Sequence, residues 1–421
     1  MINQLATMIK PVNAPENYIP LTKVDIKSLC QESLPAECHA EFSAFCLLLE
    51  HTLHYEHYQL LNTLKENYAP FDPNKDTLDL QQLTDEQRDV AQTHFNHAFT
   101  QVLNKANFEQ ITADDLTQAL NEESLFKVRL EVNFDDFAHM VFYRRGEQQK
   151  TETIRSWWGL RKQTIQFTNY DRVAVYIQFK DAAYFAKTKR TLLGFEPGAT
   201  IIKLFQNVPK ADLEMLFPNS QVRMRPIDKL VIGGSAIIGG AVVLITKLGA
   251  SLLLLFALFS YWFGLSDQPV TLNQQQLIAL GIGCAIFGSF IFKEWSKFKN
   301  RKIKFMKALA DNLYVKNLDN NAGVFHHLLD NAQDEEFKEA LLAYSVLVKA
   351  NRSMTAQEID QSIEDWLKQK TGVDIDFEID DALHKLTRLS LVIQQSEHFY
   401  AHPLSEANRI LDTQWDKVFE F

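Results

Sequence analysis

A central stretch of almost uncharged sequence, from Leu230 to Phe292, most constrains what this chain of 421 residues can fold into. About 20 apolar residues cross a hydrocarbon core of about 30 Å, because each helical residue rises about 1.5 Å. The stretch contains three uncharged runs, and a polar break separates the last two. These runs are Leu230–Thr246, Leu248–Leu265 and Leu277–Phe292. The pattern predicts a membrane hairpin in the middle of the chain.

Lysines and arginines flank this stretch on both sides, whereas the polar break contains neither. Short loops rich in these residues stay on the cytoplasmic side. We therefore expect two spans, roughly Leu248–Leu265 and Gln275–Phe292, with both termini in the cytoplasm. Leu230–Thr246 could instead be a third span, a re-entrant segment or an extension of the first span. The basic residues expected to face the membrane are Arg223, Arg225, Lys229, Lys247, Lys293, Lys297, Lys299, Arg301, Lys302 and Lys304.

The periodicity of apolar residues changes along the rest of the chain. Phe42, Phe45, Leu49, Leu53 and Leu60 follow the spacing of an amphipathic helix. From Phe126 onward the apolar residues alternate with polar ones, which predicts an antiparallel sheet with turns at Gly146, Asn169–Asp171 and Pro197-Gly198. We expect an α+β integral membrane protein with four segments. They are a helical N-terminal region (1–124), a basic antiparallel β domain (125–218), a two-helix transmembrane hairpin with basic flanks (219–305) and a helical, winged-helix-like acidic domain (306–421).

The winged-helix-like order rests on three helices and a hairpin in the last segment. Helices are predicted at Glu335–Lys349, Thr355–Trp366 and Asp380–Leu389, and the second begins with a capping box of Thr355 and Glu358. Strands at 392–394 and 398–401 would form the hairpin. The third helix opens with two aspartates, and residues 351–421 carry 7 basic and 14 acidic side chains. DNA binding needs cations that neutralise phosphates, so we expect protein contact and no nucleic acid.

Charge and cysteine usage bound the location and the partners. Residues 1–124 hold 7 basic and 19 acidic side chains, whereas residues 125–210 hold 15 and 8. The basic block could face anionic membrane lipids, or it could complement the acidic N-terminal region. Gly281, Ala285 and Ser289 have the spacing of close helix packing, so a homo-oligomer is possible. The four cysteines form no paired motif and the N-terminus has no signal-peptide core, which favours a bacterial inner membrane.

No catalytic motif stands out, and we expect no cofactor. Asp212, Glu214, Arg144 and Arg145 surround the predicted end of the sheet, where paired carboxylates could do acid–base work. The arginines could equally hold the carboxylates in structural ion pairs. The histidines with helical spacing are His51, His54, His94 and His97, which would be the ligands if a metal bound. Ordinary histidines on exposed helix faces are the more common outcome, and we expect no metal.

Several segments resemble an uncharacterised membrane family, the domain of unknown function 3754, whose eukaryotic relatives include transmembrane protein 143. The matching segments are Tyr18–Leu21, Tyr143–Gly146, Val208–Pro218, Asp228 with the glycine run and Lys247, Lys316–Gly323 and Asp376–Leu383. The resemblance implies two membrane helices, and it carries no known activity. We therefore expect a membrane-anchored, non-enzymatic scaffold or regulatory protein with interaction domains. The alternative is a membrane-bound enzyme that acts on a lipid or another anionic small molecule.

Overall fold

The computed structural model describes most of the chain, and its residues fall into two compact units. The first unit comprises Met1–Glu122, Asn133–Leu213 and Lys316–Phe421, and the second comprises Glu123–Val132 and Glu214–Val315. Within these bounds the described residues are 17–78, 83–112, 114–117, 129–156, 161–188, 195–223, 234, 238, 241–242, 249–265 and 273–418.

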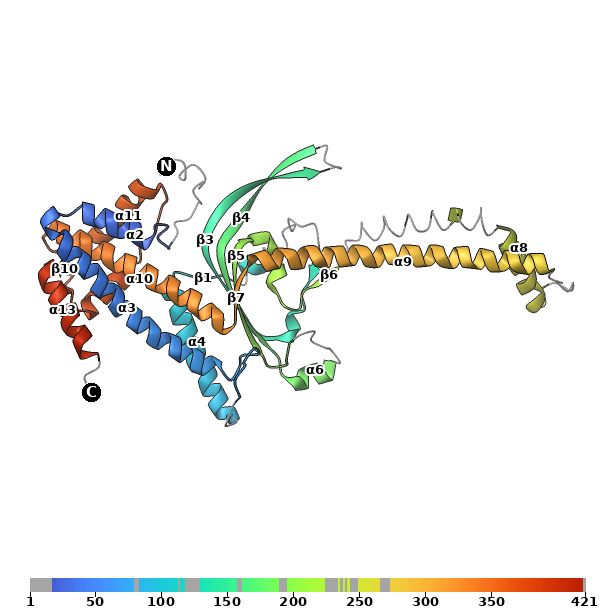
Figure 1. The fold of residues 1–421 in the computed structure, drawn as a ribbon, viewed down its shortest axis with the longest axis horizontal. Coiled ribbons are helices and arrows are strands. Elements are labelled where there is room, and N and C mark those ends of the chain that lie inside the picture. Colours follow the sequence, from blue (N-terminus) through green and yellow to red (C-terminus); the bar gives the residue numbers. More distant parts are fainter. Residues whose placement is uncertain are drawn as a thin grey trace. The chain divides into compact units, whose positions relative to one another are not determined.

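The first unit contains a five-stranded antiparallel sheet with the order β1-β3-β4-β5-β7 (Figure 1). The pairing places Val175 of β4 between Phe142 of β3 and Lys203 of β5, so the antiparallel sheet expected from the alternation is confirmed. The strands are β1 (Glu109–Gln110), β3 (Phe137–Ser156), β4 (Arg161–Phe179), β5 (Thr200–Pro209) and β7 (Asn317–Asn320). The turn at Pro197-Gly198 is also confirmed, because Gly198 has a φ of 79° just before β5.

Two of the predicted turns are wrong, because β3 and β4 continue through them. Gly146 lies within β3 with a φ of 72°, opposite Asp171 of β4. A Cβ at Gly146 would lie 2.6 Å from the Asp171 carboxylate. Glycine is therefore needed here for a close approach between strands rather than for a reversal of the chain.

Two long helices of this unit pass through two separate hydrophobic cores. They are α3 (His39–Tyr68) and α10 (Ala322–Ala350). Leu64 and Tyr68 of α3 join Phe325 of α10 and residues of α4 (Asp85–Lys105) in a core on the sheet. The other halves of α3 and α10 form a second core with the C-terminal elements. The apolar stripe predicted from Phe42 to Leu60 is buried in this second core from Phe42 to Leu53, whereas Leu60 is partly buried against the core on the sheet.

The C-terminal elements follow the predicted order of helices and hairpin. A three-stranded sheet, β8-β10-β9, joins the hairpin to a short strand that precedes the second helix. The Thr355 and Glu358 capping box is present. The elements are β8 (Met354–Thr355), α11 (Ala356–Thr371), α12 (Ile379–Arg388), β9 (Val392–Gln395), β10 (His398–Ala401) and α13 (Leu404–Lys417). The predicted first helix begins earlier than expected, because α10 starts at Ala322.

Short elements complete the first unit. The helix α2 (Lys23–Glu32) is capped by Thr22, whose hydroxyl accepts a hydrogen bond from the Asp25 amide. A 3-10 turn η1 (Ala36–Cys38) precedes α3, and η2 (Phe134–Asp136) precedes β3. The helix α6 (Ala182–Thr188) lies between β4 and β5 in sequence. The helix predicted between two prolines is the 3-10 helix η3 (Lys210–Leu216), which crosses the boundary between the units.

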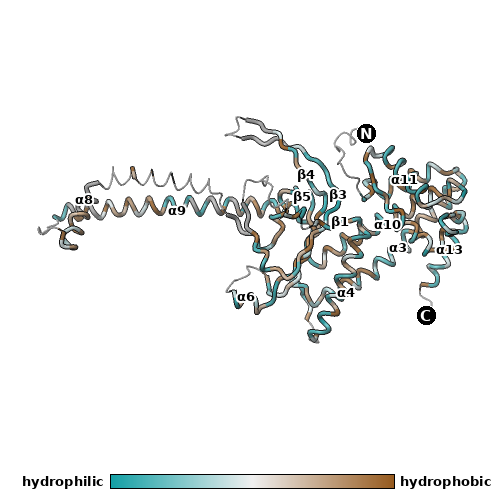
Figure 2. The backbone as a smooth tube through the Cα atoms, turned by 180° about the vertical axis from the view of Figure 1, so that it is seen from behind, coloured by the Kyte–Doolittle hydropathy of each residue, from teal (hydrophilic) through white to brown (hydrophobic). Residues whose placement is uncertain are grey.

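The second unit contains a two-stranded sheet and two helices. β2 (Arg129–Glu131) pairs with β6 (Gln221–Arg223), so the strand expected around residues 126–132 does not join the main sheet. The helices are α8 (Gly249–Trp262) and α9 (Gln274–Lys316). Figure 2 shows hydrophobic and hydrophilic residues alternating along α9.

The predicted transmembrane hairpin is wrong for the described residues, because none of their helices is long and apolar enough to cross a membrane. The helix α8 has 14 residues, which is about 21 Å of helix against a core of about 30 Å. The uncharged run of α9 ends at Phe292, and Lys293 begins a basic segment. The integral-membrane fold and the bacterial inner-membrane location both rested on the hairpin, so they are wrong with it. Most of Leu230–Thr246 and the loop at Ser266–Leu272 lie outside the described residues.

Candidate functional site

A run of charged side chains is buried in α10 where this helix passes from one core to the other. Glu335, Glu336, Lys338 and Glu339 are each at most 5 % exposed. Burying a charge is costly unless an opposite charge and hydrogen bonds compensate it. Each of these four side chains is accordingly held by partners from other parts of the first unit.

Glu336 is the centre of this cluster and faces three groups that can carry positive charge. Its Oε1 atom lies 2.8 Å from Nζ of Lys105 at the end of α4 and 3.1 Å from Nζ of Lys385 on α12. Its Oε2 atom lies 3.2 Å from Nε2 of His57 on α3. Although burial opposes ionisation, these neighbours hold the pKa of Glu336 well below its usual range.

The imidazole of His57 approaches Glu336 with one of its two ring nitrogens. The Nδ1 atom lies 2.7 Å from the Leu53 carbonyl oxygen, which can only accept a hydrogen bond, so Nδ1 carries a hydrogen. The other ring nitrogen, Nε2, faces Oε2 of Glu336 at 3.2 Å. His57 and Glu336 thus form a buried contact between α3 and α10.

Glu339 lies one helical turn from Glu336 and differs from it in protonation. Burial raises its pKa to about 7, with Lys385 and a hydrogen bond from Asn107 opposing the shift. The Asn107 side-chain amide donates to Oε1 of Glu339 at 2.9 Å, and Nζ of Lys385 is 3.8 Å from Oε2. Near neutral pH, one of the two carboxyl groups facing Lys385 is therefore only partly ionised.

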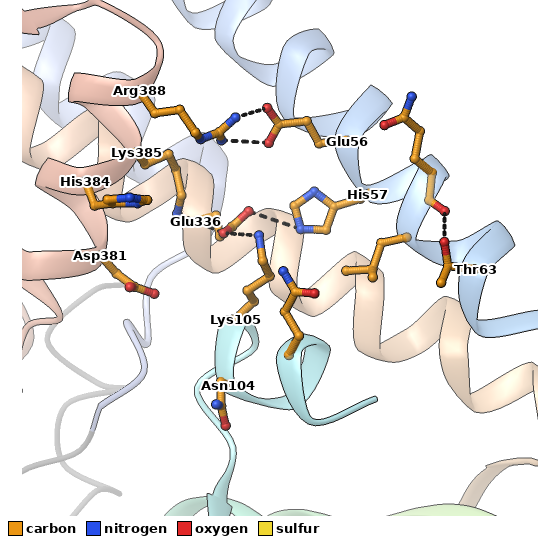
Figure 3. A pocket seen from close by; sticks show the side chains of 13 residues that line it. Glu56, His57, Thr63, Asn104, Lys105, Glu336, Asp381, His384, Lys385 and Arg388 are labelled. Carbon is orange, nitrogen blue, oxygen red and sulfur yellow. Dashed lines mark hydrogen bonds and ion pairs between the residues drawn. The ribbon is translucent and has the colours of Figure 1, made fainter. Parts of the chain in front are cut away.

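One wall of a cavity of about 590 Å³ is formed by Glu336 with Lys105, Lys385 and His57 (Figure 3). On the opposite side Arg388 of α12 donates two hydrogen bonds to the carboxylate of Glu56 on α3, at 2.5 and 2.8 Å. The lining residues come from α3, α4, α10 and α12. They are Glu56, His57, Gln59, Leu60, Thr63, Gln101, Asn104, Lys105, Glu336, Asp381, His384, Lys385 and Arg388.

The predicted catalytic residues lie away from this cavity. Arg144 pairs with Glu109 at 2.7 Å and with Glu147 at 3.0 Å. Arg145 donates to the Ala106 carbonyl oxygen and to the Asn331 side chain. Asp212 is buried in the first unit, whereas Glu214 belongs to the second. The catalytic role of Arg144, Arg145, Asp212 and Glu214 stays a prediction, and both arginines are engaged in structural contacts.

The predicted metal ligands are dispersed within the first unit. The ring of His51 lies beside Trp415, with centroids 6.2 Å apart, and His54 contacts Oε1 of Gln333 at 3.0 Å. His94 and His97 are exposed on α4. Across the part of the chain that the structure describes, no three His, Cys, Asp or Glu side chains are arranged to hold a metal ion.

The basic residues predicted to face a membrane fall into three groups. Lys293, Lys297, Lys299 and Lys304 are exposed along α9. Arg301 and Lys302 also lie in α9, and Arg223 ends β6. Arg225, Lys229 and Lys247 lie outside the described residues. The membrane-facing role of the whole set rested on the hairpin.

The sequence contains a signal for the cavity that its motifs do not reveal. Residues Asp334 to Glu339 place five charges around Phe337, in a helix that is otherwise apolar on most sides. A charged run in a helix is usually solvated, so it suggests an exposed face. Here the charged run lies where α10 meets α3, α4 and α12. No local sequence pattern shows that these four helices pack together at this point.

Comparison with known proteins identifies a family but no activity. A family model described as protein of unknown function (DUF3754) matches residues 170–323. This match confirms the resemblance to that family, whereas a relationship to transmembrane protein 143 stays a prediction. No solved structure matches the chain.

Proposed function

We propose that this chain, whose residues 170–323 match the family described as protein of unknown function (DUF3754), is a non-enzymatic regulatory protein whose cavity binds a small anionic molecule. The cavity volume of about 590 Å³ lies within the range of about 300–1,000 Å³ that is common for small-molecule sites. Buried ionisable groups with displaced pKa values often mark functional sites. Glu336 meets this condition at the cavity wall, and Glu339 does so directly behind it.

The proposal depends mainly on Lys385, whose ammonium group is buried but lacks hydrogen-bond acceptors in the part of the chain that the structure describes. Its side chain is only 5 % exposed, and among the described residues its ammonium group makes no hydrogen bond of good geometry. The contact with Glu336 at 3.1 Å supplies charge compensation but leaves the three N–H donors unused. A buried donor without an acceptor is costly, so an anion that accepts from Lys385 would relieve this cost.

The charged side chains that line the cavity balance one another. The ammonium groups of Lys105 and Lys385 and the ring of His57 surround Glu336, while Glu339 is partly protonated near neutral pH. Across the cavity, Arg388 and Glu56 neutralise each other. The lining side chains Lys105, Lys385 and Arg388 are matched in number by Glu56, Glu336 and Asp381, so an anion would be held by the free donors of Lys385 rather than by a net positive charge. A carboxylate or a phosphate group is the class of ligand that fits.

We favour binding over catalysis because the charged groups at the cavity wall already contact one another. A general base needs to accept a proton from a substrate within about 2.6–3.2 Å. Yet Nδ1 of His57 is bonded to the Leu53 carbonyl oxygen, and Nε2 is directed at Glu336 at 3.2 Å. Neither a serine nor a cysteine is among the residues that line the cavity. These features support a site that recognises a ligand without transforming it.

The acidic N-terminal and C-terminal regions are the proposed surfaces for protein partners, and nucleic acid is not a proposed partner. In α12, Lys385 and Arg388 face carboxylates of α10 and α3, while Asp380 and Asp381 occupy its first turn. The exposed Asp380 and Asp381 would repel the closely spaced phosphates of a nucleic-acid backbone. Because α12 contributes to the cavity, a ligand there could influence the surface that a partner meets.

Titration of the full chain with defined anions tests the proposed site. Inorganic phosphate, succinate and citrate would be added separately, and binding followed by calorimetry and by the shift in melting temperature. We expect at least one anion to bind the wild type and Lys368→Met, whose lysine pairs with Asp374 outside the cavity. Lys385→Met should lose this binding. Lys385→Arg, which keeps the charge, controls for misfolding.

Equal binding by wild type, Lys385→Met and Lys368→Met would place the anion elsewhere and would contradict the proposal. So would the absence of binding by all three anions at millimolar concentration, because even a weak site of about 1 mM would be detected in that range.

A further inference from the structure

A short extended segment near the N-terminus, Asn17–Leu21, is held almost entirely through its main chain; we call it the strap. The amide of Ile19 donates to Oε2 of Glu335 at 3.0 Å. Nζ of Lys338 donates to the carbonyl oxygens of Ile19 at 2.8 Å and of Leu21 at 3.3 Å. The Asn107 side chain donates to the carbonyl oxygen of Asn17 at 2.8 Å. Contacts to the main chain bind an extended peptide with little regard to its side chains.

The groups that hold the strap are already organised by one another. Glu335 and Lys338 lie one turn apart on α10, with Nζ and Oε1 2.7 Å apart. Each compensates the charge of the other through a contact within α10 that does not involve the strap. The pair is thus a ready acceptor and donor for one peptide unit, and binding of the strap need not assemble it.

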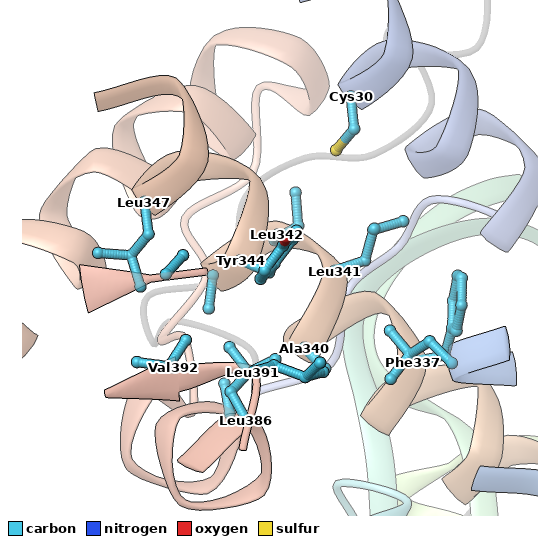
Figure 4. Close-up of a cluster of buried hydrophobic side chains, with 14 of the residues drawn as sticks. Cys30, Phe337, Ala340, Leu341, Leu342, Tyr344, Leu347, Leu386, Leu391 and Val392 are labelled. Carbon is cyan, nitrogen blue, oxygen red and sulfur yellow. The ribbon is translucent and has the colours of Figure 1, made fainter. Parts of the chain in front are cut away.

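Two side chains of the strap supply specificity. Ile19 is 2 % exposed and belongs to the core cluster whose members Cys30, Phe337 and Leu341 are shown in Figure 4. The hydroxyl of Tyr18 donates to Asp171 at 3.4 Å, and the guanidinium of Arg145 lies over its ring. Pro20 follows Ile19, and its fixed φ suits an extended chain that needs no further amide donor.

We infer that the groove formed by Glu335, Lys338, Asn107 and the Ile19 pocket is a binding site for extended peptides, which the chain closes with its own strap. The peptide it fits has an aromatic residue, an aliphatic residue and a proline in succession. Its committed occupant is the strap of a second copy of the chain, which would replace the chain's own strap. All the contacts arise within five consecutive residues, so a second copy supplies the complete set.

This inference goes beyond the proposed anion site and rests on other residues. Glu335 and Lys338 hold the strap, whereas Glu336 and Lys385 face the cavity. Asn107 links the two sites, because its amide donates both to the strap and to Glu339. Failure of anion binding would leave the peptide site unaffected, and the two proposals are tested separately.

Binding of a labelled peptide to the full chain tests the inference. The peptide would contain residues 14–24, and its anisotropy would report binding. The strap is displaced by Ile19→Asp, which introduces a charge into the apolar pocket next to Glu335. The matched control is Val24→Asp, which adds the same charge at a residue that is 70 % exposed. Circular dichroism would establish that each variant is folded.

We expect Ile19→Asp to bind the peptide at least about tenfold more tightly than the wild type or Val24→Asp, because the strap no longer competes. Adding Lys338→Met to Ile19→Asp should abolish the gain, and a peptide with Ile19→Asp should not bind. Equal binding by folded Ile19→Asp and Val24→Asp would overturn the inference.

Hydrogen exchange of the wild type keeps the inference testable if Ile19→Asp does not fold. An exchangeable strap opens locally, so the Ile19 amide should exchange faster than the core amides of α10. Exchange of Ile19 only together with global unfolding would show a fixed structural segment and would overturn the inference.

Discussion

Glu336 Oε1 lies 2.8 Å from Nζ of Lys105, although the two residues are 231 positions apart in sequence. The contact joins the end of α4 to the middle of α10, at the level between the two hydrophobic cores. His57 and Lys385 bring α3 and α12 to the same carboxylate. One side chain thus connects four helices that local sequence patterns cannot place relative to one another.

Replacement of this carboxylate by an amide, Glu336→Gln, should destabilise the protein strongly. The change keeps the shape of the side chain but leaves Lys105 and Lys385 without their shared counter-charge. Removing one partner of a buried ion pair typically costs about 3–5 kcal/mol. Urea unfolding of the variant should show a loss of this order.

The matched control for this loss is Glu406→Gln. Glu406 forms an ion pair with Arg409 at 2.6 Å on the exposed face of α13. Screening by solvent makes such pairs weak, so no measurable change is expected. A loss of similar size in both variants would mean that the buried contacts of Glu336 stabilise the protein no more than an exposed ion pair.

Stability should fall as pH rises from about 4.5 to about 7 because of Glu339. Burial raises its pKa to about 7 in the folded protein, whereas the unfolded chain releases this proton near the ordinary value of 4.5. The folded state therefore binds more protons in this window, and each rise in pH favours unfolding. Glu336, whose pKa is lowered, stabilises the folded state throughout this window, and its contribution is lost only as the pH falls below the ordinary value of 4.5.

The variant Glu339→Gln isolates this contribution. Its amide stays neutral, so its unfolding free energy should lack the part of the slope that Glu339 supplies. Burial also raises the pKa of Asp360 to about 6, but Asp360 is present in both proteins and cancels in their difference. If wild type and variant had parallel pH profiles between pH 5 and pH 8, Glu339 would not titrate there.

A buried tyrosine hydroxyl connects α3 to the sheet and gives a further test. Tyr68 is 1 % exposed, and its hydroxyl donates to the carbonyl oxygen of Thr200 at 2.8 Å. Tyr68→Phe should lower the unfolding free energy by about 1–2 kcal/mol, because the carbonyl loses its donor. Tyr58→Phe changes a residue that is 55 % exposed and should have no measurable effect in the same denaturant series. Equal effects of the two substitutions would argue against the bond to Thr200.

Local patterns in the sequence predicted the elements well where one face is buried. The stripe from Phe42 to Leu53 and the capping box of Thr355 both lie where the patterns placed them. The sheet order was less accessible, because β7 adds to β5 from a segment 108 positions beyond Pro209, after the whole second unit. Such pairing depends on tertiary contacts rather than on periodicity.

The candidate site could not be predicted because the sequence around its residues does not indicate that they are buried. Glu336 and Lys105 look like ordinary solvated charges in amphipathic helices. The predicted membrane hairpin failed for a different reason. Absence of charge indicates hydrophobicity, but a span also needs an uninterrupted helix of sufficient length, and α8 ends after 14 residues.

Gly146 provides the last test, because its predicted turn proved to be a close contact inside a strand. Gly146→Ala should be costly for two reasons. An alanine at a φ of 72° is strained by about 1–3 kcal/mol, and its Cβ would lie 2.6 Å from Oδ2 of Asp171. Asp171 is also bound by Gln148 at 2.9 Å and by Tyr18, so it cannot easily move away.

Gly198→Ala is the matched control for the contact. Gly198 has a similar φ of 79°, but nothing lies within 4 Å of the position of its Cβ. Both variants suffer the backbone strain, and only Gly146→Ala also meets Asp171. Thermal and urea unfolding should therefore show a larger loss for Gly146→Ala. Equal losses would mean that backbone strain alone selects glycine at position 146, and that the approach of β3 to Asp171 tolerates a methyl group.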